Sequence, residues 1–320
     1  MSRVKVKVVQ LRRQGTGSLG IRLQALPNEM LPAFSAGAHI DLILPGGLTR
    51  QYSIASAPSC RAYYELCVKQ APGSRGGSRF IHETLAVNDE LEISLPRNLF
   101  ALQAADHHVL VAGGIGITPL LSMAAELMEK GQSFTLHYYT KSLAEAAYVE
   151  HLTSGFAEGN VCLHHSDQGR SPRQHLPDDF QRPQPGTHLY LCGPHALMAH
   201  MTEQAIRRGW DQRQIHQEAF SAPEGVADAS KDQAFDVQLQ SSGQLVQVNA
   251  DQSIANALLQ AGIEVPVSCE QGFCGACLTQ VLDGIPCHRD SVMSDAEKGL
   301  NNQMTLCCSR SQSARLVLGL

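Results

Sequence analysis

The spacing of hydrophobic and polar residues changes twice along the chain. In roughly the first hundred residues, short runs alternate apolar with polar positions and end at Pro and Gly, which is typical of antiparallel strands. The clearest runs cover residues 4–8, 39–44, 63–69 and 90–95. This part of the chain is therefore expected to form a small antiparallel β-barrel.

From residue 109 onward, continuous apolar runs alternate with stretches of helical period. We expect strands at 109–112, 134–139, 161–165 and 188–192, and helices at 119–130, 144–152 and 196–208. Such alternation predicts a parallel sheet with crossover helices.

A second change follows residue 220, where small and polar residues are typical of a linker. Strands are expected to resume at 235–239 and 245–248, and Ser253 can cap a short helix that ends at Gly262. No internal repeat is evident, so we do not expect a solenoid.

Composition narrows the classes of function. The 320 residues are 43% hydrophobic and 17% charged, and the net charge is −5 without a long basic run, which argues against a nucleic-acid partner. The longest stretch without charged residues or histidine, 109–125, contains three glycines and a proline and is too short to span a membrane. We expect a cytoplasmic protein that binds neither nucleic acid nor membrane.

The cysteines are unevenly distributed, because six of the ten lie in the last 52 residues. Four and then two residues separate Cys269, Cys274 and Cys277, and Cys307 follows after a further 29 residues. This is the plant-type 2Fe-2S spacing, in which three thiolates share one loop and the fourth is distant. Gly272 and Gly275, which lie between these cysteines, suit a loop that turns sharply around a cluster.

Three alternatives remain open at this point. Cys308 could replace Cys307 as fourth ligand. Zinc could use the Cys274–Cys277 pair, although zinc ribbons usually repeat such a pair. Cys162-Leu-His164 with Cys192-Gly-Pro-His195 superficially matches a Rieske ligand set, but their positions suit strands of a nucleotide-binding sheet better.

Two further motifs suggest cofactor binding. Residues 112–119, Ala-Gly-Gly-Ile-Gly-Ile-Thr-Pro, join an expected strand to a helix, where glycines let the backbone approach a phosphate. Alone, this run is weak evidence. The chain also contains Arg50-Gln-Tyr-Ser and Ser74-Arg-Gly-Gly-Ser before this run and Cys192-Gly-Pro after it.

With the cysteine pattern, this set of motifs resembles the ferredoxin reductase superfamily, and closely the phthalate dioxygenase reductase and vanillate demethylase reductase family. The resemblance spans essentially the whole chain. It implies a flavin-binding β-barrel at 1–104, an NAD-binding α/β domain at 105–224, a linker at 225–233 and a plant-type 2Fe-2S ferredoxin domain of α+β (β-grasp) type at 234–320.

The resemblance also implies roles for the residues that match the family's motifs. The flavin phosphate would be held by Arg50 and the turn of Arg75, Gly76, Gly77 and Ser78. Tyr52 would pack on the flavin ring, and Ser53 would lie near its N5. The family's flavin is FMN; the motifs themselves leave FAD open.

For the nicotinamide coenzyme, the resemblance implies phosphate and ribose contacts from Gly113, Gly114, Gly116 and Thr118. Cys192, Gly193 and Pro194 would line the nicotinamide site, and Phe220 would shield the flavin there. Ser53, Cys192 and Phe220 are thus the expected reaction-site residues. The family preference is NADH, although Lys141 leaves NADPH open.

The resemblance thus implies a reductase that passes electrons from NADH through FMN and a 2Fe-2S cluster to a terminal Rieske-type oxygenase of aromatic catabolism. We expect a monomer. The cofactors would carry the chemistry, so no acid–base dyad is required. A reductase for a different monooxygenase is the closer alternative, and a zinc-containing nucleotide sensor the more distant one.

Overall fold

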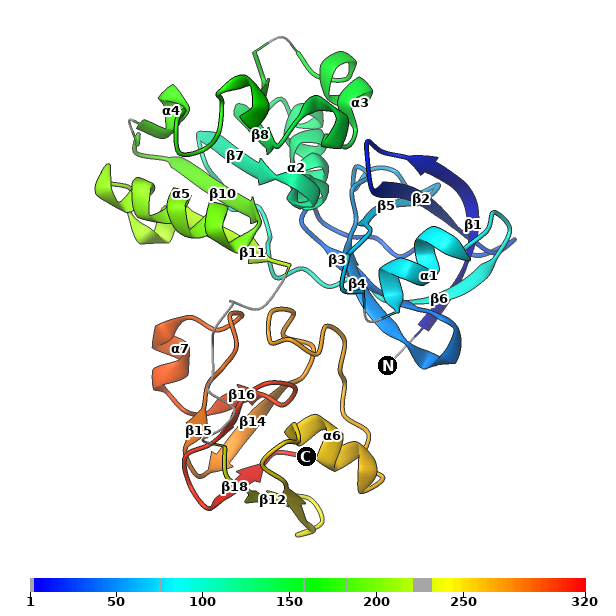
Figure 1. Cartoon of the computed structure of the whole chain (residues 1–320), viewed down its shortest axis with the longest axis vertical. Helices are drawn as coiled ribbons and strands as arrows, with labels where there is room; N and C mark the ends of the chain where they lie inside the picture. The colour runs from blue at the N-terminus through cyan, green and yellow to red at the C-terminus, as the bar shows by residue number, and fades with distance from the viewer. Residues whose placement is uncertain (1–2, 75, 158, 182, 221–231) are drawn as a thin grey trace. The chain divides into compact units, whose positions relative to one another are not determined.

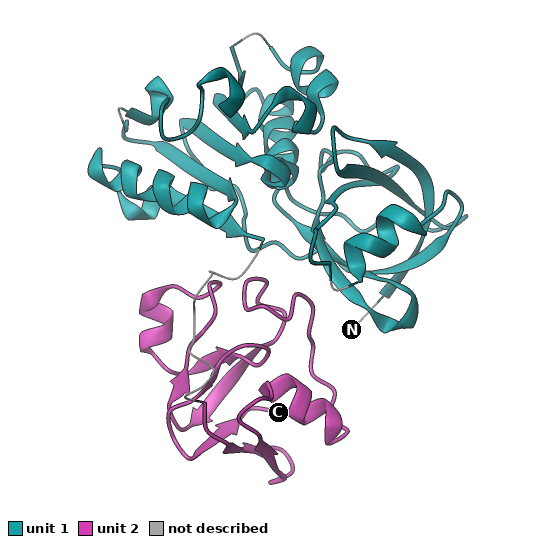
Figure 2. Ribbon diagram, in the orientation of Figure 1, with its two compact units in different colours: residues 1–220 teal, residues 221–320 magenta. Residues whose placement is uncertain are grey.

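The computed structural model describes residues 3–74, 76–157, 159–181, 183–220 and 232–320. The chain divides into two compact units, residues 1–220 and residues 221–320 (Figure 2). Each unit is described by itself. The three-domain boundaries expected from the sequence stay a prediction, and most of the expected linker lies outside the described residues.

Unit 1 begins with a six-stranded antiparallel sheet in the order β4-β3-β6-β1-β2-β5 (Figure 1). The hydrogen bond from Ala55 N to Glu65 O, at 2.7 Å, links the chain just beyond β4 to β5, as in a barrel. Its strands are β1 (Arg3–Arg13), β2 (Ser18–Ala25), β3 (His39–Ile43), β4 (Thr49–Ser53), β5 (Tyr64–Lys69) and β6 (Glu90–Ser94).

Alternation explains why these segments are strands. In β1, Val6 and Val8 are fully buried while the lysines between the valines stay accessible. The valines join one apolar core with Ile21, Leu23 and Ile40, and each fully buried aliphatic side chain contributes about 1.5–3 kcal/mol. The short elements of this part are η1 (Pro45–Gly47) and α1 (Gly77–Glu83).

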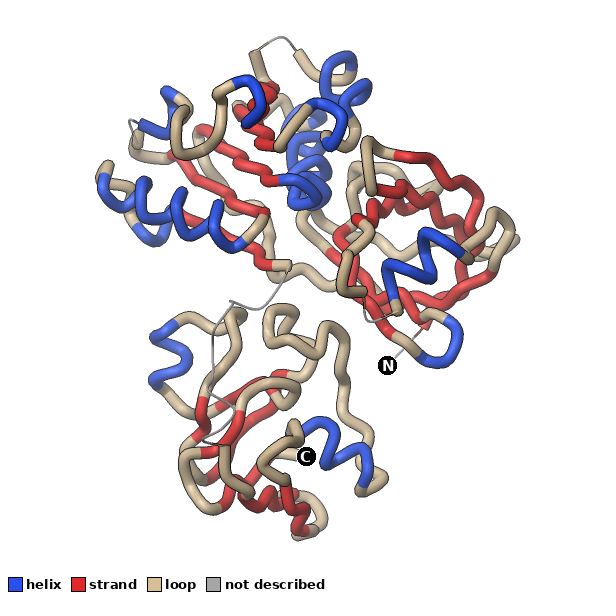
Figure 3. The backbone as a smooth tube through the Cα atoms, viewed as in Figure 1, coloured by secondary structure: helices blue, strands red, loops and turns tan. Residues whose placement is uncertain are grey.

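The second half of unit 1 is a five-stranded parallel sheet in the order β11-β10-β7-β8-β9, with helices beside it (Figure 3). The order reverses between β7 and β10, and ligands of such sheets bind at the carboxyl ends of the strands there. The strands are β7 (His107–Gly113), β8 (Phe134–Thr140), β9 (Val161–His165), β10 (Thr187–Gly193) and β11 (Ile215–Ala219).

Helices cover both faces of this sheet. Leu120 and Leu127 of α2 pack with Tyr190 on one face, whereas Met201 of α5 packs with Leu189 on the other. The helical elements are η2 (Gly114–Gly116), α2 (Ile117–Glu129), η3 (Leu143–Glu145), α3 (Val149–Ser154), η4 (Ser166–Gln168), α4 (Asp178–Gln181), α5 (His195–Arg207) and η5 (Gln212–Gln214).

The prediction of a single helix at 144–152 is wrong. The segment is interrupted at Tyr148, whose φ of 59° lies in the left-handed region, and a regular helix begins only at Val149. Buried Ala146 and Ala147 fill the apolar core at this point. Packing of this segment against the core therefore overrides its helical propensity.

Unit 2 is a mixed five-stranded sheet in the order β13-β12-β18-β14-β16, in which β12 and β18 run parallel. Ser253 caps α6 as expected, because its side chain accepts from Asn256 N at 3.2 Å. The elements are β12 (Phe235–Leu239), β13 (Leu245–Val248), α6 (Ile254–Gln260), β14 (Leu278–Asp283), β15 (Pro286–Cys287), α7 (Asp295–Gly299), β16 (Gln303–Thr305), β17 (Arg310–Ser311) and β18 (Arg315–Leu318).

An ion-pair cluster holds the start of the described part of unit 2. Asp232 pairs with Arg289 at 2.9 Å and lies 3.5 Å from Arg310. Arg310 also donates to three backbone carbonyls and is only 5% exposed. Among the described residues, no helix combines the length and apolar character needed to cross a membrane.

Candidate functional site

Two loops meet at the switch point of the parallel sheet. A Cβ on Gly116 would lie 2.2 Å from the carbonyl oxygen of Cys192, and a Cβ on Gly193 would lie 3.0 Å from Cα of Gly113. Such distances exclude any side chain at these positions without movement of the backbone. The glycines expected to contact the coenzyme phosphates therefore have a structural role as well, because they allow the loops after β7 and β10 to pack in direct contact.

A cavity of about 160 Å³ opens beside these loops at the carboxyl ends of the strands. Gly114 has a φ of 53°, and a Cβ there would meet no atom within 4 Å, so its backbone borders open space. Of the coenzyme residues expected from the sequence, this cavity's lining includes Gly113, Gly114 and Pro194. Lys141 also lines it, as do Ser18 and Lys69 from the barrel.

The other expected coenzyme residues do not line this cavity. Thr118 is 2% exposed, and its hydroxyl donates to the carbonyl of Ile115 at 3.1 Å. Gly116 and Cys192 are buried against each other. In this structure these residues support the loop, and their contact with a coenzyme stays a prediction.

The residues expected at the flavin phosphate lie together. Gly77 packs on the side chain of Arg50 so closely that a Cβ would lie 2.6 Å from Arg50 Cγ. Gly76, with a φ of 98°, makes the turn before it, and Ser78 Oγ accepts from Ala71 N at 3.1 Å. Arg75 lies outside the described residues.

Tyr52 follows Arg50 on β4 and is paired with Ile40 of β3. Burial raises the pKa of the Tyr52 phenol to about 12, although the Arg50 charge opposes that shift. The ring is therefore a neutral, partly buried platform beside a guanidinium. Arg50 and Tyr52 together can hold a phosphate and an aromatic ring.

The barrel and the parallel sheet meet at Ser53 and Glu218. The Ser53 hydroxyl is hydrogen-bonded to the Glu218 carboxyl group, and Nδ1 of buried His39 lies 3.9 Å from Glu218 Oε1. Burial raises the pKa of Glu218 to about 8, partly offset by the Ser53 hydrogen bond. The Oε2 atom of Glu218 is buried and has no hydrogen-bond partner among the described residues.

Cys192 and Phe220 flank this contact. Cys192 pairs with Glu218 in the β10–β11 register and is fully buried. Burial, reinforced by the Glu218 charge, raises the pKa of the Cys192 thiol well above its usual range, so the thiol is not a nucleophile. Phe220 follows β11 directly and packs half-buried against the core that contains Cys192.

Sequence reasoning assigned no role to three of these residues. Glu218 stands in the stretch Glu-Ala-Phe that ends at Phe220, and His39 begins the strand expected at 39–44. Lys69 reads as a surface lysine at a strand end. Strand pairing places His39 opposite Ser53 and Glu218 opposite Cys192, and the contact between the two sheets of unit 1 brings His39 and Glu218 together.

The four expected cluster ligands gather in unit 2. The Cys269 thiol is in hydrogen-bonding contact with those of Cys274 and Cys307, and the Cys277 thiol with that of Cys307. The Gln271 amide donates to Cys269 Sγ at 3.3 Å. Buried sulfurs with amide donors are the environment that an iron–sulfur cluster requires.

The Cys308 thiol is in hydrogen-bonding contact with that of Cys307 but has further partners of its own. Gly272, with a φ of 78°, packs against it so that a Cβ would lie 2.4 Å from Cys308 Sγ. Cys308 Sγ also lies 3.2 Å from the hydroxyl of Thr305. This packing favours Cys307 as the fourth ligand and leaves Cys308 as a residue that supports the loop.

The donor set fits a 2Fe-2S cluster better than zinc. Three of the four thiols share one loop and the fourth comes from a distant segment, which is the plant-type 2Fe-2S arrangement. The sequence has no second Cys-x-x-Cys pair of the kind that zinc ribbons usually repeat. Nor is a Rieske set assembled, because β7 and β8 separate Cys162 on β9 from Cys192 on β10.

Comparison with known proteins agrees with this geometry. Residues 237–312 match the family described as a 2Fe-2S iron-sulfur cluster binding domain, and residues 95–215 match the N-terminal domain of dimethylamine monooxygenase subunit DmmA-like proteins. A vanillate O-demethylase oxidoreductase from Pseudomonas sp. is 42% identical over 99% of this chain and 100% of its own length.

Two further similarities cover most of the chain. A heme-dependent oxidative N-demethylase beta subunit from Ectopseudomonas mendocina is 41% identical over 91% of this chain and 90% of its own. The solved structure of phthalate dioxygenase reductase, described as modular for electron transfer from pyridine nucleotides to [2Fe-2S], matches with a TM-score of 0.76. It is 36% identical, over 100% of this chain and 98% of its own. The chain therefore belongs to the family of oxygenase-system reductases that includes vanillate O-demethylase oxidoreductase and phthalate dioxygenase reductase.

Proposed function

We propose that this chain carries electrons from NADH, through FMN and a 2Fe-2S cluster, to the terminal Rieske-type oxygenase of a catabolic system, as a cytoplasmic monomer. The contact of Ser53 with Glu218 is the observation that carries the proposal. It places the end of the expected flavin strand β4 beside the end of strand β11 of the nucleotide-binding sheet. A flavin and a nicotinamide could therefore meet there.

In this proposal the barrel holds FMN. Arg50 offers paired guanidinium donors to its phosphate, and the turn of Gly76, Gly77 and Ser78 closes around the same group. Arg75 belongs to the proposed turn, outside the described residues. Tyr52 provides the surface for the ring system. FMN ends at one phosphate, which matches a site built around Arg50 and one turn.

NADH is proposed to lie across the carboxyl ends of β10, β7 and β8. Its phosphates would lie over Gly113 and Gly114 at the start of α2, where amides and the helix dipole favour negative charge. Lys69 and Lys141 line the same cavity and supply positive charge. Because Lys69 comes from the barrel, coenzyme binding would involve both halves of unit 1.

When bound, a flavin accepts electrons in pairs and releases them singly, which couples a two-electron donor to a one-electron cluster. The residues around it position the reactants and hold a proton. Glu218 keeps its proton up to about pH 8 and can exchange it through the hydroxyl of Ser53. Buried Cys192 and half-buried Phe220 keep water from this contact.

An anaerobic NADH titration followed by visible and EPR spectra tests the proposal. We expect NADH to bleach the flavin absorbance and then to produce the EPR signal of a reduced 2Fe-2S cluster. Mass analysis of the released flavin distinguishes FMN from FAD, and light scattering tests the monomer. Flavin reduction without a reduced-cluster signal would contradict the electron path.

The second candidate function is a reductase for a heme-containing monooxygenase. It is favoured by the 41% identity to a heme-dependent N-demethylase subunit and by the DmmA-like match. The two acceptors are distinguished by stopped-flow oxidation of the NADH-reduced protein by a purified Rieske oxygenase and by a purified heme N-demethylase. Faster oxidation by the heme protein would overturn the Rieske assignment.

A further inference from the structure

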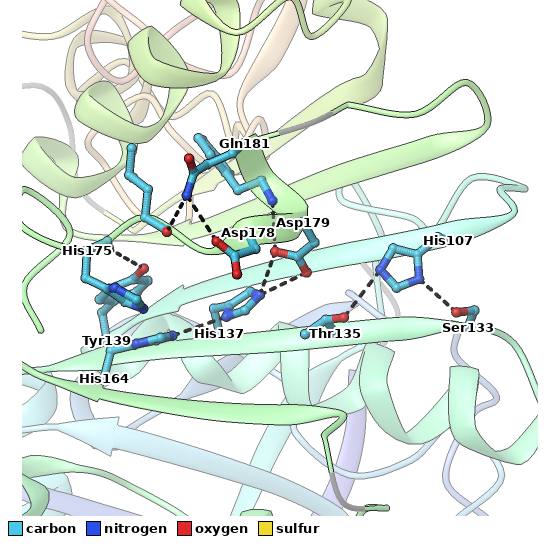
Figure 4. Close-up of polar contacts among 12 residues, drawn as sticks. His107, Ser133, Thr135, His137, Tyr139, His164, His175, Asp178, Asp179 and Gln181 are labelled. Carbon is cyan, nitrogen blue, oxygen red and sulfur yellow. Dashed lines mark hydrogen bonds and ion pairs between the residues drawn. The ribbon is translucent and has the colours of Figure 1, made fainter.

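A cluster of aromatic and charged side chains lies between β8, β9 and α4, away from the contact of Ser53 with Glu218. We call it the histidine cluster, and Figure 4 shows its members side by side. They are His137 and Tyr139 of β8, His164 of β9, Asp179 of α4, and His175 in the segment between β9 and α4. None of them belongs to the flavin, coenzyme or iron–sulfur residues assigned above.

His137 is the centre of the cluster. Its Nε2 lies 3.0 and 3.1 Å from the two carboxylate oxygens of Asp179, and its Nδ1 lies 3.2 Å from Nε2 of His164. Burial would lower the pKa of His137, but hydrogen bonds to Asp179 and Cys162 raise it to about 9. A protonated His137 therefore donates to Asp179 and His164 together.

His164 links His137 to the ring of Tyr139. Burial and the charge of His137 lower the pKa of His164 to about 3, so its imidazole is neutral and accepts from His137. The ring stacks on Tyr139 with centroids 4.4 Å apart and planes 17° apart. The Tyr139 hydroxyl donates to the backbone carbonyl of His175 at 3.0 Å.

Tyr139 also lines the coenzyme cavity, together with Ser166 and Pro172 of the segment that leads to His175. The cluster thus stands directly behind one wall of that cavity. Its far end is anchored as well, because Asp179 Oδ1 accepts from Phe180 N at 2.8 Å and the Phe180 carbonyl accepts from Trp210 Nε1 at 2.9 Å.

The strand order indicates which part of the coenzyme this wall would meet. With phosphates over β7, the nicotinamide must extend toward Glu218 on β11, so the adenosine extends the other way, toward β8 and β9. We infer that His164 and the His137–Asp179 pair are positioning residues that fix the adenosine-side wall of the coenzyme pocket. The inference rests on the proposed function.

Neighbouring aspartates on α4 provide a matched test. Asp179→Asn keeps the size of the side chain but leaves His137 without its counter-charge. Asp178→Asn is the control, because Asp178 is exposed and its side chain contacts Gln181. Each purified holoenzyme is assayed by dye reduction with NADH and with reduced nicotinamide mononucleotide, which lacks the adenosine half.

We expect D179N to raise KM for NADH about three- to tenfold while kcat changes less than about twofold. KM for the mononucleotide should be unchanged in D179N, and D178N should resemble the wild type with both donors. An unchanged KM for NADH in D179N, or equal losses with both donors, would overturn the inference and leave a purely structural cluster. Failure of wild-type protein to use NADH would instead contradict the proposed function.

Tyr139→Phe keeps the test informative if D179N fails to fold. It removes the hydroxyl that holds the His175 carbonyl and preserves the ring stacked on His164. We expect the same selective rise in KM for NADH, but a smaller one. If this variant had the same KM as the wild type for both donors, that result would also count against the positioning role.

Discussion

Glu218 illustrates how one buried side chain can link the stability of this protein to pH. Its carboxyl group is buried between the barrel and the parallel sheet, and its pKa is raised from 4.5 to about 8. Between these values the folded protein holds a proton that the unfolded chain has released. The free energy of unfolding contributed by this residue therefore falls as pH rises from about 4.5 to about 8.

Glu218→Gln removes this dependence, because an amide has no proton to release. We expect the thermal midpoint of E218Q to decline less with pH across that range and to exceed the wild-type midpoint at its alkaline end. Calorimetry over a pH series measures both. Glu90→Gln, at an exposed carboxylate on β6, is the control; a parallel decline in wild type and E218Q would contradict the buried-proton argument.

The adjacent cysteines 307 and 308 allow a second residue-scale prediction. Cys274→Ser and Cys307→Ser should abolish the visible absorption and EPR signal of the cluster while NADH still reduces the flavin. Cys308→Ser should retain the cluster, because Cys308 packs against Gly272 and Thr305. Iron content and anaerobic spectra measure the outcome. Full iron content in C307S together with loss of iron in C308S would show that Cys308, and not Cys307, is the fourth ligand.

At the scale of elements, the contact between the loops after β7 and β10 decides the shape of the coenzyme site. Gly116→Ala would force the carbonyl of Cys192 away, since its Cβ would lie 2.2 Å from that oxygen. We expect a loss of about 1–3 kcal/mol in the free energy of unfolding, together with weaker NADH binding.

Urea unfolding and NADH titration measure the two effects. Gly73→Ala is a matched control, because a Cβ at Gly73 would meet no atom within 4 Å. If G116A unfolded and bound NADH like G73A, the loop contact would not support the site as described.

At the scale of the whole molecule, each unit has its own apolar core. Trp210 is the single tryptophan and lies in unit 1, whereas the expected cluster absorbs in unit 2. We expect fluorescence and cluster absorbance to give two separate denaturant transitions. The free energy of unfolding should fall about twofold more steeply with denaturant concentration for the Trp210 transition than for the cluster transition, because unit 1 is about twice as long as unit 2.

Flavin release provides the control for this experiment, since it should follow the tryptophan signal and not the cluster signal. Coincident midpoints and slopes for all three probes would contradict independent units.

Local pattern was sufficient for much of this protein. Alternating valines predicted strands around one core, the cysteine spacing identified the iron–sulfur segment, and Ser253 marked a helix start. These features depend on residues close in sequence, so periodicity and spacing reveal them. The motif order also identified the family, which the full-length relatives confirm.

Only the tertiary structure decided the rest. Tyr148 interrupts an expected helix because its segment packs into the core, and Glu218 gains its raised pKa only through burial beside Ser53. The histidine cluster joins residues from three elements that the sequence separates by up to 42 positions. Burial and long-range contact set these properties, and neither is visible in the local order of residues.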